Sequence, residues 1–441
     1  MTRHLARQLG LALIALAVSA TSLAQLKIEI TSGVTDPIPI AIVPFARGAG
    51  TDAVDVAAVV QADLERSGRF KPMARGDMLT QPIRSEDIDL AAWRQQRNDF
   101  VAVGRVTAAG GQSLVEVELV NVLNGQRLMT ERFATPSRNL RGAAHRVSDA
   151  IYQKILGVRG AFATRIAYVS VDGRPPNQRY QLIVADSDGE NARVILESKQ
   201  PLMSPAWSAD GDWLAYVSFE RRVSAIYVQQ VRTGQRSMVS SRAGVNGAPS
   251  WSPDGKTLAV TLSGKSGNLD IYLLDLANQS LRRVTSDPGI DTEAVFSPDG
   301  RELYFTSDRS GNPQIYRLAI GDPDRPKRVT FSGGYNSRAR ISPDGKQLAM
   351  TTLDAGAYRV AIQDLANGTV SILSRGRLDE SPSFAPNSAI LIYAGRERGQ
   401  GILASVSVDG ATSQRLKADA GEVREPVWGP FLTNGAAAAQ D

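Results

Sequence analysis

Ala248-Pro-Ser-Trp-Ser-Pro-Asp-Gly-Lys-Thr-Leu-Ala-Val260 is one copy of a unit that recurs along the second half of this 441-residue chain. Each copy carries a large apolar residue at the same position. These residues are Trp207, Trp251, Phe296, Ile341, Phe384 and Trp428, and their spacings are 44, 45, 45, 43 and 44. A period of roughly 40–50 residues is typical of a propeller or a solenoid, so the repeat indicates the fold before any single residue is considered.

The repeated unit predicts four short β-strands. Ser-Pro-Asp-Gly favours a tight turn, because proline presets φ and because Asp and Gly suit the positions that follow it. The turn joins two β-rich runs, and two more follow in every copy, for example residues 269–275 and 280–286. No helical period separates these runs, which predicts the blade of a β-propeller.

The two ends of the repeat array are out of phase. The first copy begins at residues 165–170, which match the second strand of a blade, and residues 425–430 form a first strand with nothing after it. The two fragments complete each other. We therefore predict a six-bladed propeller closed by the C-terminal strand, an arrangement that leaves no exposed strand edge at the junction.

Residues 1–24 are typical of a cleaved secretory signal. Arg3 and Arg7 precede a short apolar run at residues 11–18, and small residues before Gln25 suit a signal peptidase. The apolar run is too short to span a bilayer, and Gln25 stands where a lipoprotein would have cysteine. We expect an exported, soluble protein.

Residues 25–158 predict a small α+β domain. Strands are expected at residues 38–43, 99–106, 114–119 and 127–133, one helix capped by Thr51 or Asp52, and another ending near Gly157. A short junction leads into the propeller at 159–432, so we expect a packed interdomain contact, followed by a flexible tail at 433–441. Residues 25–33 alternate apolar and polar side chains. They predict either an edge strand of their own domain or a segment free to dock or to pair with another protein.

The composition excludes several kinds of chemistry. The chain has no cysteine, which excludes thiol catalysis and cysteine metal sites. Removing the two arginines of the signal from 50 basic residues leaves 48 against 45 acidic ones, a net charge of +3. Nucleic-acid binding requires clustered basic charge, which this balance does not support.

Candidate catalytic residues are few. His145 is the one histidine after the signal; it falls on the predicted last helix, where a polar helix position is favoured over a Ser–His–Asp hydrolase. The repeated tryptophans share register with Phe296 and Ile341, so we expect them to pack between blades instead of stacking on sugars. The repeated turn aspartates each belong to a separate blade, so turn geometry is favoured over metal binding. These aspartates are Asp210, Asp254, Asp299 and Asp344.

The loops before each first strand differ from blade to blade and should converge at one mouth of the central channel. Unlike polar loops on a rigid ring are typical of a binding site. They span residues 201–204, 245–248, 290–293, 334–337, 378–381 and 423–425. The acids Asp291, Glu293 and Asp379 are candidates for a channel-bound calcium ion, although a hydrated rim is favoured. For the loops as a whole, partner binding is favoured.

The whole chain after the signal resembles the TolB family, the periplasmic components of the Tol–Pal envelope system of Gram-negative bacteria. The resemblance rests on residues 160–168, 201–208, 246–249, 305–316 and 378–382, together with the order of the signal, the α+β domain and the propeller. Ser-Pro-Asp-Gly alone is weak support, since many propellers use it.

The resemblance implies a non-enzymatic scaffold for outer-membrane integrity and for constriction during cell division. It implies binding of the lipoprotein Pal at the channel mouth, of TolA by the mature N-terminus, and of other envelope proteins and bacteriocins, by a monomer that needs no cofactor. The implied Pal contacts are Asn246, Ala248, Thr292, Glu293, Asn336, Asp379 and Glu380. The implied TolA contacts are Gln25, Leu26, Lys27, Ile28, Glu29 and Ile30. A cation-dependent hydrolase or lactonase and a small-ligand-binding propeller remain the alternatives.

Overall fold

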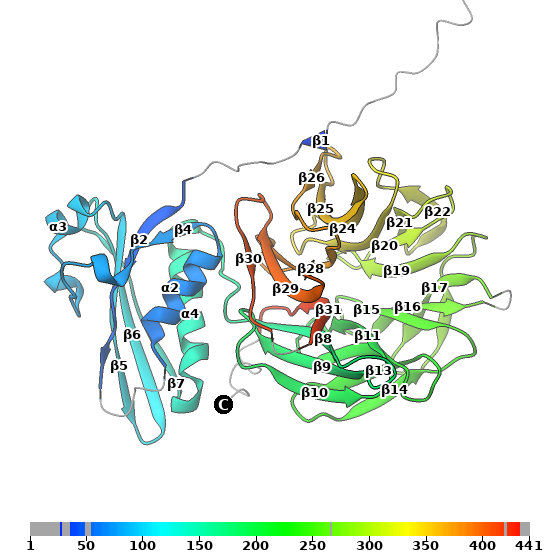
Figure 1. The fold of residues 1–441 in the computed structure, drawn as a ribbon, viewed down its shortest axis with the longest axis horizontal. Helices are drawn as coiled ribbons and strands as arrows, with labels where there is room; N and C mark the ends of the chain where they lie inside the picture. The colour runs from blue at the N-terminus through cyan, green and yellow to red at the C-terminus, as the bar shows by residue number, and fades with distance from the viewer. Residues whose placement is uncertain (1–26, 29–35, 49–53, 265–266, 419–420, 433–441) are drawn as a thin grey trace, which may run out of the picture.

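The computed structural model describes residues 27–28, 36–48, 54–264, 267–418 and 421–432. An N-terminal α+β unit lies beside a β-propeller, and the helices α2 and α4 lie between the N-terminal sheet and the propeller (Figure 1). The predicted signal, the predicted tail and most of the predicted N-terminal segment, including Gln25, Leu26, Glu29 and Ile30, lie outside the described residues.

The N-terminal unit is built on one mixed sheet with the strand order β4-β2-β5-β6-β7. Its strands are β2 (Ile38–Ile42), β3 (Ala46–Arg47), β4 (Phe70–Pro72), β5 (Phe100–Ala109), β6 (Gln112–Asn121) and β7 (Arg127–Pro136). The helices α2 (Val56–Arg66) and α4 (Leu140–Leu156) cover one face, and the short α3 (Leu90–Gln95) packs against the other. The predicted α+β class and its four strands are confirmed, whereas β3, β4 and α3 carried no clear sequence signal.

Alternation along β6 explains why the sheet is buried on the helix side. Val115, Val117 and Leu119 are fully buried against α2 and α4, while Glu116 on the opposite face pairs with Arg105 and Arg132. The start of α2 differs from the prediction. Asp55 is the N-cap, because its carboxylate accepts the N–H of Ala58 at 3.0 Å, while Thr51 and Asp52 lie outside the described residues.

The described strands of the propeller form six four-stranded blades, which confirms the predicted fold class. The first contains β31 (Glu422–Trp428), β8 (Arg165–Asp172), β9 (Arg179–Asp186) and β10 (Arg193–Ser198). The second contains β11 (Leu202–Trp207), β12 (Trp213–Ser218), β13 (Ala225–Gln230) and β14 (Arg236–Ser240). The third contains β15 (Asn246–Trp251), β16 (Thr257–Ser263), β17 (Leu269–Asp275) and β18 (Leu281–Arg283). The fourth contains β19 (Asp291–Phe296), β20 (Glu302–Ser307), β21 (Gln314–Ala319) and β22 (Asp322–Arg328). The fifth contains β23 (Asn336–Ile341), β24 (Gln347–Asp354), β25 (Ala357–Asp364) and β26 (Val370–Ile372). The sixth contains β27 (Glu380–Phe384), β28 (Ile390–Glu397), β29 (Gln400–Ser407) and β30 (Ser413–Arg415).

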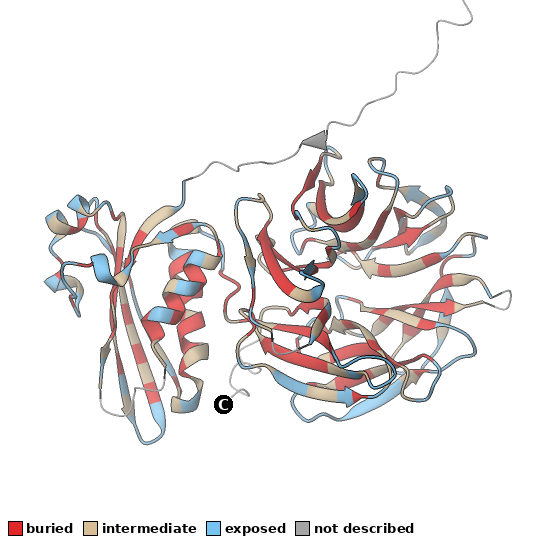
Figure 2. Cartoon of the chain, viewed as in Figure 1, coloured by how far each residue is buried: buried red, intermediate tan, exposed pale blue. Residues whose placement is uncertain are grey.

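The C-terminal strand closes the ring as predicted. β31 pairs antiparallel with β8, with Val423 opposite Ser170 and Trp428 opposite Ile166. Burial is concentrated in the middle strands of each blade (Figure 2), whose apolar side chains pack against the neighbouring blade.

The repeated residues have the structural roles expected of them. In the third blade the Ser252 hydroxyl donates to Asp254 at 2.6 Å, and Asp254 accepts the N–H of Lys256 at 3.1 Å, so the aspartate fixes its own turn. The Trp251 indole N–H donates to the carbonyl of Ala206 in the second blade at 3.1 Å. The tryptophans therefore tie adjacent blades together and do not form a sugar-binding surface.

The strand β1 (Lys27–Ile28) lies away from its own domain. It pairs in parallel with the outer strand β26 of the fifth blade, with Lys27 opposite Val370 and Ile28 opposite Ser371. The alternative of an edge strand in the N-terminal sheet is therefore wrong for these two residues, because the free edge of the blade provides their hydrogen-bonding partner (Figure 1).

None of the helices in the described parts of the chain combines the length and the apolar character needed to cross a membrane.

Candidate functional site: the channel of the propeller

The six first strands β31, β11, β15, β19, β23 and β27 line the central channel, and each carries a register shift in its pairing. At this shift one residue adopts a positive φ between 44° and 58°. We call these six residues the mouth ring. They are Ser204, Ala248, Glu293, Arg338, Ser381 and Glu425. A non-glycine residue with positive φ is uncommon, so six at equivalent positions mark a feature built into every blade.

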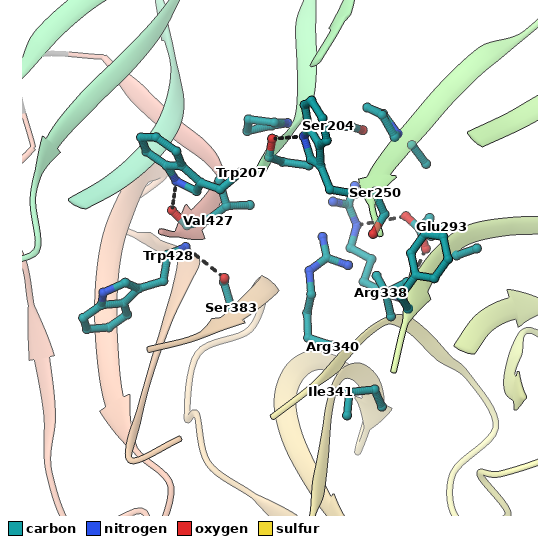
Figure 3. Close-up of a pocket in the computed structure, with 18 of the residues that line it drawn as sticks. Ser204, Trp207, Ser250, Glu293, Arg338, Arg340, Ile341, Ser383, Val427 and Trp428 are labelled. Atoms are coloured by element: carbon teal, nitrogen blue, oxygen red, sulfur yellow. Dashed lines mark hydrogen bonds and ion pairs between the residues drawn. The ribbon is translucent and has the colours of Figure 1, made fainter. Parts of the chain in front are cut away.

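The charges of the mouth ring are interlocked (Figure 3). Arg338 contacts Glu425 at 3.1 Å and Glu293 at 3.4 Å, and it donates to the Ser381 hydroxyl at 2.9 Å. Burial opposes charge on Arg338, but the nearby carboxylates outweigh it and raise the pKa of its guanidinium. The ring therefore presents a fixed polar pattern and not a set of mobile side chains.

The residues two positions before the mouth ring anchor the rim loops. Asn246 is fully buried and accepts the Ser240 hydroxyl at 2.7 Å and the Arg242 N–H at 2.9 Å. Asn336 is equally buried and donates to Gln314 at 2.9 Å. Two of the predicted partner contacts, Asn246 and Asn336, thus have side chains turned into the protein, because the loop backbone needs them.

Asp291 and Asp379 occupy the same anchoring position. Asp291 is fully buried and accepts a two-pronged ion pair from Arg309, at 2.9 and 2.8 Å. Asp379 accepts the N–H of Gly376 at 2.7 Å, and burial raises the pKa of its carboxyl. With Glu293 held by Arg338, the three proposed calcium ligands each have a partner of their own. A cation at this end of the channel stays a prediction, and it would have to displace those partners.

Thr292, Glu380 and the mouth-ring residues Ala248 and Glu293 keep partial exposure at the channel entrance. The Thr292 hydroxyl lies 3.3 Å from that of Thr261, and Glu293 accepts the Thr306 hydroxyl at 3.1 Å. Ala248 and Glu293 line the central cavity, and Thr292 and Glu380 directly precede the mouth-ring residues Glu293 and Ser381 in the chain.

The sequence reasoning missed a ring of apolar residues three positions before the mouth ring, which we call the outer ring. Its exposed members are Val245, Ile290 and Leu378, with Ile290 at 44 % exposure. Pro201 and Tyr335 occupy the equivalent positions in two other blades and are half-buried. In the first blade this position is not apolar, because it is Glu422, which pairs with Arg396 and Arg424. The signal was present in the sequence, because the repeat period alone aligns these residues around the mouth.

His145 has a more specific environment than the sequence indicated. It lies on helix α4, as predicted, and the structure adds that it is 2 % exposed. Its Nδ1 lies 2.7 Å from Asp63 of α2, and its Nε2 lies 3.8 Å from both Asp186 and Asp188 in the first blade. The histidine therefore lies at the packed contact between the N-terminal unit and the propeller, which the short junction predicted.

Two arginines complete this interdomain cluster. Arg66 pairs with Asp63 at 2.9 Å, and Arg141 pairs with Asp188. Asp63, His145 and Asp188 offer ligand atoms within 4.8 Å of one another, but the two guanidiniums already neutralise the carboxylates. Asp186 is a third carboxylate in the cluster, and the two guanidiniums neutralise only two of the three. A protonated His145 therefore balances the charge.

Two family models match the chain. The TolB amino-terminal domain matches residues 26–128, and the TolB beta propeller domain matches residues 152–432. The chain belongs to the TolB family. It is 47 % identical over 430 residues to the Tol-Pal system protein TolB of Xanthomonas euvesicatoria, covering 96 % of this chain and 98 % of that relative. It is 51 % identical over 413 residues to the protein of the same name from Thioalkalivibrio sulfidiphilus, covering 93 % and 94 %.

The crystal structure of TolB from Acinetobacter baumannii has the same fold, with a TM-score of 0.84 at 42 % identity, covering 92 % of this chain and all of that one. Membership in the TolB family makes the chain a component of the Tol–Pal system of the Gram-negative cell envelope. A system of this kind implies protein partners in the envelope.

Proposed function

We propose that this protein is a non-enzymatic periplasmic scaffold of the Tol–Pal system that binds the lipoprotein Pal at the channel mouth and TolA through residues 25–33. The outer ring carries the proposal. Val245, Ile290 and Leu378 expose apolar surface at equivalent positions around a polar mouth. Apolar residues grouped on an exposed surface and rimmed by polar ones are typical of protein–protein contacts.

The rigidity of the mouth supports the same proposal. Four of the six rim loops have a buried polar anchor, namely Asn246, Asp291, Asn336 and Asp379, and each first strand is fixed by its bulge, so the surface is formed before a partner arrives. Preformed surfaces bind with a smaller loss of conformational entropy. Asn246 and Asn336 contribute by holding these loops, while Ala248, Thr292, Glu293 and Glu380 are placed to touch Pal.

The pairing of β1 with β26 supports a second, separable site. Adding a strand to a free sheet edge is a reversible mode of peptide recognition. In the described part of this segment, Lys27 and Ile28 pair with the blade. TolA would compete with β26 for the same segment, which gives a docked and a released state.

The Pal site is tested by an aspartate at the outer ring. We expect Ile290→Asp to weaken binding of purified Pal at least tenfold by calorimetry, because a charge is placed in a desolvated contact. Val194→Asp is the matched control, since Val194 is 46 % exposed against 44 % for Ile290 and lies on the outer strand β10. Equal Pal affinity for the two variants would exclude the mouth as the interface.

The TolA site is tested by removing residues 25–33 from the mature protein. Binding of TolA should be lost, and backbone amides of β26 should exchange with solvent faster because β1 no longer covers them. Pal binding should persist. Undiminished TolA binding by the shortened protein would disprove this assignment.

The alternative of a cation-dependent hydrolase has weaker support. His145 is remote from the channel, at the interdomain contact, and the channel acids Asp291 and Glu293 are engaged by Arg309 and Arg338. This alternative predicts turnover that disappears with a chelator and with Asp291→Asn.

A further inference from the structure

A second ring of residues lies two positions beyond the mouth ring, deeper in the channel, and we call it the inner ring. Its members are Ala206, Ser250, Val295, Arg340, Ser383 and Val427, and all six line the central cavity. In the aligned repeats this position is otherwise small or apolar, so Arg340 is the single charged residue among these six. The fifth blade has therefore placed one cation inside a ring that carries no carboxylate.

The guanidinium of Arg340 has few partners. Its Nη1 donates to the carbonyl of Ala339 at 2.8 Å, and among the described residues no carboxylate forms an ion pair with it. An arginine has five N–H donors, so most of them remain available. Figure 3 shows the side chain directed into the pocket, below Arg338 and across from Ser383.

The two channel arginines have opposite electrostatic environments. Glu425 and Glu293 raise the pKa of Arg338 despite its burial. Burial lowers the pKa of Arg340, and the same glutamates compensate only in part. A desolvated charge without a paired counter-ion is costly, so Arg340 is the cation in this channel that lacks a counter-ion of its own.

The cavity around Arg340 has room for a counter-ion. Its volume is about 370 Å³, far above the roughly 10–15 Å³ that one water molecule needs. Ser250 and Ser383 add hydroxyls to the same ring. The Ser383 hydroxyl oxygen accepts the N–H of Trp428 at 2.9 Å, which leaves its own hydrogen to donate.

We propose that the inner ring is an oxyanion-binding site in which the guanidinium of Arg340 holds a carboxylate, phosphate or sulfate group entering through the mouth. A planar guanidinium binds two oxygens of such a group side by side, and the hydroxyls of Ser250 and Ser383 can donate to the remaining oxygens. The site is separate from the mouth surface proposed for Pal. The anion comes either from solution or from an acidic side chain of a bound partner, and both sources share this chemistry.

The site is tested with inorganic sulfate and with acetate, titrated into the full mature protein at constant ionic strength and followed by calorimetry. We expect saturable binding by the wild type and at least a roughly tenfold loss in Arg340→Met, given the strength of hydrogen bonds to charged groups. Arg340→Lys keeps the positive charge but lacks the two parallel N–H donors of a guanidinium, so this variant should bind sulfate and acetate with intermediate affinity. Arg301→Met is the matched control, because Arg301 is 86 % exposed outside the channel and its removal should change nothing.

Glu293→Gln gives a second measurement that does not depend on the folding of the Arg340 variants. Removing this nearby negative charge should tighten sulfate binding. The absence of saturable binding of both anions by the wild type, or equal affinity in the wild type and a folded Arg340→Met, would overturn the proposal.

The source of the anion is decided by adding purified Pal. If sulfate and Pal compete, and Arg340→Met also weakens Pal, the oxyanion is a carboxylate of the partner. If sulfate binds equally with and without Pal, the anion is a free solute. Both outcomes support the site. The first also requires Pal at the mouth and therefore rests on the proposed function, whereas the second does not.

Discussion

Replacing His145 by glutamine should destabilise the N-terminal unit by about 3 kcal/mol at pH 6, the lower end of the range for breaking a buried ion pair. The substitution removes the imidazolium that lies 2.7 Å from Asp63 and 3.8 Å from Asp186 and Asp188. The lower end applies because Asp63 keeps Arg66 and the Ser148 hydroxyl, at 2.9 and 2.7 Å. The buried cluster is left with one uncompensated negative charge.

The pH dependence of this loss has a definite sign. Burial opposes charge on His145, but Asp63 outweighs it and raises the pKa of the imidazole. A raised pKa contributes stability that is complete below the unfolded value of about 6.5 and is lost as the pH rises through the folded value. Burial also opposes charge on Asp63, yet His145 and Arg66 lower its pKa, so its contribution is lost only below about pH 3.9. The difference between wild type and variant should be largest between about pH 4.5 and 6.5 and should shrink above.

Urea unfolding followed by helical circular dichroism measures this directly, because the α-helices of the described chain belong to the N-terminal unit. Lys154→Gln is the matched control, since it removes a positive charge from an exposed position of the same helix α4. The reasoning is refuted if His145→Gln is as stable as Lys154→Gln at pH 6. It is also refuted if the difference between the two variants stays constant from pH 6 to pH 9.

Three further predictions concern the propeller. Trp428→Ala should lower its stability by about 3 kcal/mol, because Trp428 is buried and its indole N–H donates to Thr164 at 2.8 Å; an unchanged thermal melt would argue against closure by β31. Arg309→Met should cost about 3 kcal/mol by leaving the buried Asp291 unpaired, and adding Asp291→Asn should recover part of that loss in urea unfolding. Thr292→Arg with Glu380→Arg should abolish Pal binding in a pull-down while the thermal melt stays the same; retained binding would place the interface elsewhere.

The blades were predictable because each repeats the same local chemistry. The Ser252–Asp254 turn and the continuous apolar runs of the middle strands, such as β12 and β16, follow from residues close together in the chain. The out-of-phase copy at 425–430 predicted closure for the same reason, since an unpaired first strand requires a blade that lacks one. In the N-terminal unit β6 had clear alternation of apolar and polar residues, whereas β4, with three residues, was too short to show a pattern.

The site was predictable only in part. The rim loops were correctly placed at one mouth, but Asn246 and Asp379 turn inward, because a loop backbone without a regular ladder needs side-chain partners. The outer ring was overlooked because single exposed apolar residues are ordinary in a sequence. They become a surface only when the period places Val245, Ile290 and Leu378 around one opening.

The sequence by itself determined the period, the number of blades, the closing strand and the family, since all of these depend on residues close together in the chain or on exact repetition. Tertiary structure decided which groups meet across large separations. His145 lies beside Asp186 and Asp188 of the first blade, and Lys27 and Ile28 pair with β26. Arg340 has no ion pair with a carboxylate of the described residues. The physical reason is that charge balance and desolvation depend on everything within a few ångströms in space, whereas turns and strand alternation depend on a few residues along the chain.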